Sequence, residues 1–270
     1  MATRGSEGVG SAGLLRSMAI QRRVIHALVL REMLTRYGRH NIGFLWLFVE
    51  PMLFTVGVTI LWTATKSVHG SDLPIVAFAL TGYSSVLLWR NMPGRTIKAL
   101  EPNLALLYHR NVRPIDIYLS RLILEMAGAT MSFVFLGLAF YFVNWLEPPE
   151  DVLMVIGGWL MLGWFGFALA LLLGAVSETS ETIEKLWHPL SYLLFPLSGA
   201  AFLVDALPAA AQNFVLYLPM VHGVEYLREG YFGSQVVGHY DMTYMALCNT
   251  LVTLAGLALV AKVSRSVVPE

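Results

Sequence analysis

The chain has 270 residues, of which 56% are hydrophobic and only 13% are charged. Soluble domains carry about a quarter charged residues, so this composition excludes an ordinary soluble protein and indicates an integral membrane protein. Basic and acidic residues balance at 18 each, which leaves no electrostatic basis for nucleic-acid binding, and the single cysteine, Cys248, excludes an internal disulfide.

The N-terminal segment 1–13, MATRGSEGVGSAG, is small and polar, and we expect it to be flexible. It lacks the short apolar core and cleavage site of a removable signal peptide. Residues 14–40 are predicted to form a helix that lies in the membrane interface. The apolar face of this helix comprises Leu14, Met18, Ile25, Leu28 and Val29. The alternative is a soluble helix that packs on another subunit.

Six stretches are apolar enough to be candidates for crossing a bilayer, which takes about 20 residues of helix. They are 44–65, 73–90, 118–143, 152–176, 187–204 and 243–262. A seventh stretch, 206–224, contains Pro208, Gln212, Asn213 and Pro219. We expect it to form broken helices that dip into one face of the membrane, because non-helical backbone survives there only where protein or water satisfies it. The predicted fold is all-α, a polytopic membrane protein with one transmembrane domain over 14–270.

Basic residues predict the orientation. With the N-terminus inside and six spans, sixteen lysines and arginines lie on the cytoplasmic side, and only Lys66 and Arg228 lie outside. This asymmetry is the positive-inside pattern, so both termini are expected in the cytoplasm. A seventh span would export Lys262 and Arg265, which counts against it.

An acidic residue lies inside the first span. Residues 35–51 read TRYGRHNIGFLWLFVEP, so a basic cluster precedes the apolar run and Glu50 lies within it. At 1.5 Å per residue, Glu50 is about 10 Å along the helix from Gly43. An acid at this depth is a functional candidate by default. We predict a structural role instead, either pairing with a basic residue such as Arg90 or capping backbone that Pro51 frees.

Motifs for nucleotide binding and hydrolysis are absent from the sequence. No GxxxxGK[ST] phosphate loop occurs, so we expect that this chain does not itself bind ATP. No HExxH or GxSxG occurs, and the seven histidines are scattered, so we predict no metal site and no catalytic residue. Serines near the spans are interpreted as packing residues.

Four stretches carry a resemblance to a known family. They are LREMLTRYGRHNIGFLWLFVEPML, EPNLALLYHRNVRPIDIYLSR at 101–121, HPLSYLLFPLSGAAFLVDALP at 188–208 and LPMVHGVEYLREGYFG at 218–233. Together they resemble the permease subunit of type-2 ABC exporters, in particular the KpsM-type permeases for capsular polysaccharide. The resemblance runs from about residue 25 to the C-terminus.

The resemblance implies a homodimer in the bacterial inner membrane that exports a lipid-linked polysaccharide. It implies two copies of a separate, KpsT-like ABC ATPase that bind ATP and Mg²⁺, no cofactor on this chain, and further periplasmic and outer-membrane export components. Exporters of O-antigen, teichoic acid, lipid or drugs share the architecture and remain alternatives. An intramembrane enzyme acting on lipid-linked sugars is the alternative from another class.

The loop 91–116 would contact the ATPase by analogy with the family, through a short helix that follows Pro102. The candidate coupling residues are Asn103, Leu104, Leu107, Tyr108, Arg110 and Arg113. The alternative is a basic loop that only sets topology.

Aromatic side chains are candidates for a polysaccharide path because they offer flat stacking surfaces. The candidates are Trp46, Trp62, Trp159, Trp164, Tyr192 and Phe195, together with the basic Arg228. Interface anchoring and packing are the alternative for the aromatic residues, and local ion pairs with Glu225 and Glu229 are the alternative for Arg228. The resemblance implies that 206–233 forms outer re-entrant helices between spans five and six.

Overall fold

A computed structural model of the protein describes residues 9–38, 45–65, 73–108 and 112–267. Within these ranges the regular structure is helical, without a β-strand, which confirms the all-α prediction. The α-helices are α1 (Val9–Tyr37), α2 (Trp46–Thr65), α3 (Ile75–Thr96), α4 (Leu104–Leu107), α5 (Pro114–Phe142), α6 (Val152–Ser177), α7 (Glu181–Leu194), α8 (Ala209–Val215), α9 (Pro219–Phe232) and α10 (Met242–Val267).

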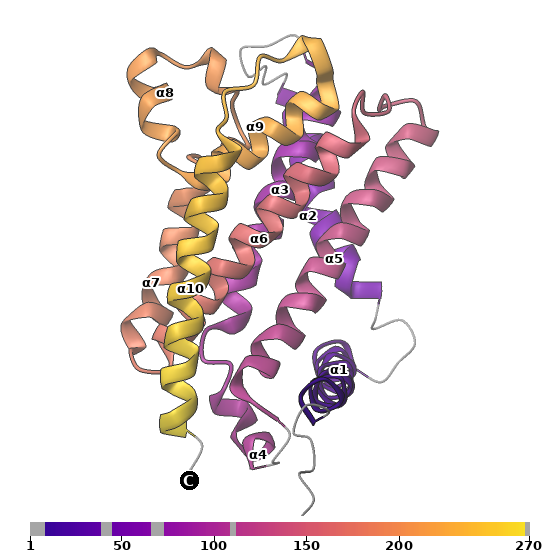
Figure 1. Ribbon diagram of the computed structural model, residues 1–270. Helices are drawn as coiled ribbons and strands as arrows, with labels where there is room; N and C mark the ends of the chain where they lie inside the picture. The colour runs from indigo at the N-terminus through magenta and orange to yellow at the C-terminus, as the bar shows by residue number, and fades with distance from the viewer. Residues whose placement is uncertain (1–8, 39–44, 66–72, 109–111, 268–270) are drawn as a thin grey trace, which may run out of the picture.

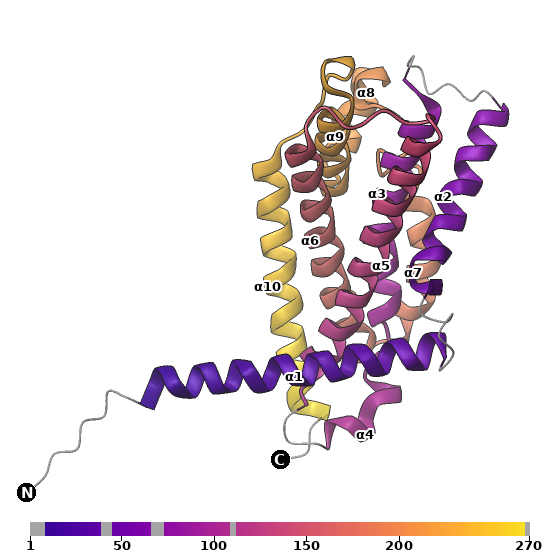
Figure 2. The same ribbon diagram turned by 90° about the vertical axis from the view of Figure 1, so that its right-hand side faces the viewer.

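Six of these helices, α2, α3, α5, α6, α7 and α10, form an upright bundle (Figure 1). The long helix α1 lies across one end of the bundle, with the short α4 beyond it (Figure 2). We call this the α1 end; the last turn of α10 also lies there. Helices α8 and α9 lie at the opposite end, the α8 end. Helix α1 begins at Val9, so it includes part of the segment 1–13 that we expected to be flexible.

Among the described residues, four helices are long and apolar enough to cross a membrane: α2, α5, α6 and α10. The expected second and fifth spans are not among these four helices. The second, 73–90, corresponds to α3, which carries Arg90 and Arg95 near its C-terminal end. The expected span 187–204 is wrong in its bounds, because α7 has only 14 residues, ends at Leu194 and is followed by turns.

Helix α6 is the centre of the bundle, with more than half of its most apolar window buried. Small residues along it let neighbouring backbones approach closely, as is common between membrane helices. A Cβ atom added at Gly166 would lie 2.8 Å from the Cα of Trp89 on α3, and one at Gly158 would lie 3.0 Å from backbone atoms of Leu227 on α9. Glycine at these two positions therefore sets the distance of α3 and α9 from α6.

The predicted apolar face of α1 is only partly turned toward the protein. Leu28 is buried, Ile25 and Val29 are half-buried, and Met18 is exposed. The side chain of Leu14 lies outside the described part of the chain. Leu30 and Leu34, on another side of the helix, are also exposed.

Candidate functional site

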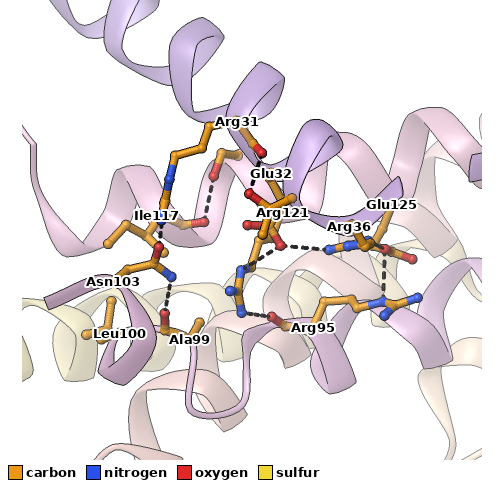
Figure 3. A network of polar contacts seen from close by, with 12 residues as sticks. Arg31, Glu32, Arg36, Arg95, Ala99, Leu100, Asn103, Ile117, Arg121 and Glu125 are labelled. Carbon is orange, nitrogen blue, oxygen red and sulfur yellow. Dashed lines mark hydrogen bonds and ion pairs between the residues drawn. The ribbon is translucent and has the colours of Figure 1, made fainter. Parts of the chain in front are cut away.

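Four charged residues join α1 to α5 at the α1 end. Glu32 and Arg36 are four residues apart on α1, and Arg121 and Glu125 are four apart on α5 in the reverse order of charge. Each carboxylate therefore meets a guanidinium of the other helix: Arg121 Nε lies 3.2 Å from Glu32 Oε1, and Arg36 pairs with Glu125 (Figure 3). Arg36 Nη2 also lies 3.1 Å from Glu32 Oε1. These four side chains are only 11–16% exposed.

Arg95 brings α3 into the same network. Its Nε lies 3.0 Å from Glu125 Oε1, and its carbonyl accepts a 2.8 Å hydrogen bond from Arg121 Nη1. Two carboxylates thus hold three guanidinium groups from α1, α3 and α5. We call Glu32, Arg36, Arg95, Arg121 and Glu125 the ion network. Removing one partner of a partly buried pair costs more than removing one partner of an exposed pair, because the remaining charge has little access to water.

The loop before α4 is attached to α1 through an asparagine. Arg31 Nη1 donates a 2.6 Å hydrogen bond to Asn103 Oδ1, and Asn103 Nδ2 donates to the Ala99 carbonyl at 2.8 Å (Figure 3). Asn103 is 4% exposed. The Leu100 amide donates a hydrogen bond to Glu178 Oε1, just after α6. Burial raises the pKa of the Glu178 carboxyl above its usual range, and this hydrogen bond offsets part of the rise. The loop is therefore anchored to both α1 and α6.

The candidate coupling residues divide between inward and outward positions. Leu104 and Tyr108 are exposed, at 44% and 80%, and Arg113 is exposed at the start of α5. Asn103 and Leu107 are buried inside the chain, so their side chains offer no surface to a partner in this structure. Arg110 lies outside the described residues.

A polar cavity of about 250 Å³ lies between α2, α3 and α7. It is lined by Glu50, Pro51, Phe54, Leu87, Arg90, Asn91, Gly94, Arg95, Trp187, His188, Ser191 and Tyr192. The Arg90 guanidinium carbon lies 5.2 Å from the centroid of the Tyr192 ring, a cation–π contact. Charged groups, hydrogen-bonding groups and aromatic rings of three helices thus face one space.

A second hollow of about 480 Å³ is lined by Arg36, Trp46, Glu50 and Arg95. Because it shares Glu50 and Arg95 with the polar cavity, the two form adjoining spaces near the α1 end. Arg36 and Arg95 also belong to the ion network. The residues that bind α1 to the bundle therefore border the polar space between α2, α3 and α7.

Glu50 is exposed to these two hollows. Arg90 lines the same cavity, yet none of the described basic residues lies within ion-pair distance of Glu50. The expected pairing of Glu50 with Arg90 is therefore not present in the structure. The acid instead faces open polar space.

The six aromatic candidates lie in different places. Trp46 and Tyr192 line the two hollows, and they are 51% and 66% exposed. Phe195 packs edge-on against Tyr83 at 5.7 Å, and Trp62 lies 6.1 Å from Phe78, measured between ring centroids.

Two tryptophans of α6 lie away from the polar cavity. Trp159 is buried, stacks on Phe133 with centroids 4.5 Å apart, and donates to Thr130 Oγ1 at 2.9 Å. Trp164 donates to Thr253 Oγ1 of α10 at 3.1 Å. Packing, rather than the predicted path, accounts for Trp159 because its ring is covered.

Arg228 is fully buried on α9. Its guanidinium donates to the carbonyls of Gly199, Ala200 and Phe202 at 2.5–2.6 Å and lies 3.8 Å from the centroid of the Phe78 ring. The predicted contact with a polymer is thereby corrected, since Arg228 has no exposed surface and caps the backbone that follows α7.

The alternative for Arg228, local ion pairs, is only partly supported. Glu225 is buried beside Arg228, and its electrostatic attraction partly offsets the loss of hydration. Glu225 oxygens also accept hydrogen bonds from the amides of Val204 and His239, both at 3.3 Å. Arg228 thus holds the segment after α7 by three carbonyls, and Glu225 joins the Val204 amide of that segment to the His239 amide before α10.

Sequence reasoning did not find the ion network. Its members are separated by up to 93 positions, from Glu32 to Glu125, and no spacing connects α1 with α5. The available signal was the pair of i, i+4 motifs of opposite polarity, Glu-to-Arg at 32/36 and Arg-to-Glu at 121/125.

Comparison with known proteins places most of the chain in one family of membrane transporters. Residues 23–232 match the family model for the ABC-2 type transporter. The capsule polysaccharide export inner-membrane protein CtrC of Neisseria meningitidis serogroup B is 45% identical over 94% of this chain and 96% of its own length. The corresponding protein BexB of Haemophilus influenzae is 42% identical over 94% and 96%. The polysialic acid transport protein KpsM of Escherichia coli is 25% identical over 89% and 93%.

Proposed function

The chain belongs to the ABC-2 type transporter family, and from this premise we propose that it is the membrane-spanning permease of an ATP-driven exporter of lipid-linked capsular polysaccharide. Similarity to capsule export proteins over 94% of the chain carries the proposal. Membership in a transporter family sets aside the intramembrane enzyme as the main alternative. The membrane is the bacterial inner membrane, as in the names of these relatives.

The proposed orientation places the α1 end in the cytoplasm. The ion network and the basic residues of α1 lie at this end, in agreement with the positive-inside rule. Helices α8 and α9, within 206–233, then face the periplasm. Both termini are cytoplasmic under this proposal.

Energy comes from a separate ABC ATPase, proposed as two KpsT-like copies that bind ATP and Mg²⁺. The contact surface on this chain is the outward side of α4, where Leu104 and Tyr108 are exposed. Movement of α4 would reach α1 through Asn103 and Arg31, and would reach α6 through Leu100 and Glu178. Tyrosine is enriched among the residues that dominate binding at protein interfaces, so the exposed Tyr108 is the stronger anchor of the two.

The polar cavity between α2, α3 and α7 is the proposed binding space for sugar units. Sugar hydroxyls both donate and accept hydrogen bonds, so the Glu50 carboxylate can accept from them while the Arg90 guanidinium donates. Tyr192 and Trp46 offer ring faces to the apolar side of a sugar. Two copies of the chain would enclose a longer path than one.

The test uses the permease with its ATPase in liposomes. Capsular polysaccharide should stimulate ATP hydrolysis, whereas drugs or free phospholipid should not; stimulation by drugs alone would contradict the proposed substrate. Leu104→Asp and Tyr108→Asp should keep normal protein levels but lose polymer-stimulated hydrolysis and export. Leu107→Asp is the contrast, because a charge at this buried position should lower the amount of folded protein.

A further inference from the structure

An apolar groove of about 660 Å³ lies between α5 and α6, on a different side of the bundle from the polar cavity. Its lining comprises Met92, Leu122, Ile123, Met126, Ala127, Thr130, Met131, Leu160, Gly163, Trp164 and Phe167. We call it the α5–α6 groove. It shares no lining residue with the two polar hollows, so nothing in the proposed export path accounts for it.

The polar atoms in the lining are already used. The Thr130 hydroxyl donates to the Met126 carbonyl at 2.7 Å and accepts from Trp159 Nε1 at 2.9 Å. Trp164 Nε1 donates to Thr253 on α10. The side chains of this groove therefore offer an occupant apolar surface and little else, which excludes a sugar or an ion as the ligand.

The shape suits a narrow chain. The floor is formed by Met92 and Leu122, which are 1% and 2% exposed, and the rims include Ile123 and Leu160, which are 46% and 57% exposed. Gly163 keeps the groove deep, because a Cβ there would lie 2.8 Å from the Met126 sulfur.

The length of the groove matches one leaflet of a bilayer. The lining on α5 runs from Leu122 to Met131, about 14 Å at 1.5 Å per residue. One leaflet contributes about 15 Å of hydrocarbon. Leu122 follows Arg121 of the ion network, so the groove starts near the level of α1 and extends toward the middle of the bundle.

Helix α1 has an exposed cation, Arg22, on the side away from α4. Arg22 and Arg31 are nine residues apart, which is two and a half helical turns, so they project from opposite sides of α1. Arg31 bonds Asn103, next to α4, and α4 lies beyond α1 from the bundle (Figure 2). Arg22 is exposed, and because it lies opposite Arg31 it is on the side of α1 nearer the membrane, where a lipid phosphate would lie.

We propose that the α5–α6 groove binds one acyl chain of a phospholipid from the leaflet next to α1, with the lipid phosphate at the Arg22 side of α1. Three observations support a lipid over a protein occupant. Both flanking helices are apolar enough to cross a membrane, the groove is as long as one leaflet, and it ends near the level of a basic interfacial helix. The site would bind a structural lipid that supports the position of α1 on α5.

Native mass spectrometry of the intact transporter with its ATPase, titrated with phosphatidylglycerol, tests the proposal. Ala127→Phe adds a ring at an exposed position in the groove and should lower lipid affinity about tenfold, the effect of about two buried methylene groups. Val134→Phe is the matched control, because residue 134 is two turns along the same side of α5, exposed at 52% and outside the groove. It should bind lipid as the unchanged protein does.

A second measurement uses the unchanged groove, and Trp164→Phe serves only to identify the part of the fluorescence that comes from the groove. In detergent, phosphatidylglycerol with brominated chains should quench the part of the fluorescence that Trp164→Phe removes, and this quenching should saturate at one lipid per chain. Arg22→Gln should weaken phosphatidylglycerol binding while a chain-only detergent binds as before. Non-saturating quenching, equal lipid binding by Ala127→Phe, or a change of oligomeric state in place of lipid loss would each overturn the proposal.

Discussion

The ion network gives the sharpest quantitative prediction. Glu125→Gln keeps the size of the side chain but removes the carboxylate that Arg36 and Arg95 share. A hydrogen bond to a charged group contributes about 1.5 to 3 kcal/mol, and the Arg36 pair belongs in this range because both side chains are at most 15% exposed. The Arg95 side chain is 35% exposed, so solvent screening limits that pair to about 1 kcal/mol. Arg95 and Glu125 both belong to the bundle, so the docking of α1 loses only the Arg36 pair, about 2 kcal/mol.

Docking of α1 is measured by hydrogen exchange of residues 21–37 in the purified transporter, with the unfolding midpoint in the same detergent as the second readout. Exchange in α1 should accelerate strongly in Glu125→Gln while exchange in α6 stays slow. Exchanging the charges, Arg36→Glu with Glu125→Arg, should not restore the protection, because it would bring two carboxylates together at positions 32 and 36 and two guanidinium groups together at positions 95 and 125.

Glu181→Gln is the control. Its pair with Lys185 is also i, i+4, at 3.5 Å, but the two side chains are 79% and 76% exposed. Pairs of this kind contribute about 0.5 kcal/mol or less, so α1 should be unaffected. Unchanged exchange of α1 in Glu125→Gln would refute the reasoning, since it would mean that apolar contacts such as that of Leu28 hold the helix without the network.

Three further changes have expected outcomes. Arg228→Gln should lower the free energy of unfolding by about 3 kcal/mol, because three carbonyls lose a charged donor, and a thermal melt that matches the unchanged protein would contradict the capping role. Gly166→Val should reduce folded protein in the membrane, because its Cβ would meet the Trp89 backbone at 2.8 Å, whereas Gly57→Val, which has open space, should not. Arg90→Gln should assemble normally but slow polysaccharide export about tenfold through loss of a charged donor in the polar cavity; export at the normal rate would remove Arg90 from the path.

Arg228 and Glu50 show where prediction from residues alone reached its limit. Glu50 was singled out because a charge within an apolar segment is costly, whereas Arg228 was predicted to contact the polymer. Their partners depend on which distant segments pack beside them. Arg228 meets carbonyls 26 to 29 positions earlier in the chain, and Glu50 meets open space where an ion pair with Arg90 was expected. Local spacing carries no information about either contact.

The apolar blocks by themselves determined that this is a helical membrane protein, and the four resembling stretches identified its exporter family, which the comparisons confirm. Hydrocarbon requires long apolar helices, so composition alone reveals the fold class. Only the tertiary structure decided that Asn103 and Leu107 turn inward, that α7 stops at Leu194, and that residues of α1, α3 and α5 share one ion network. These features depend on long-range packing, which brings together charged residues that lie far apart in the chain, and no local pattern specifies which ones meet.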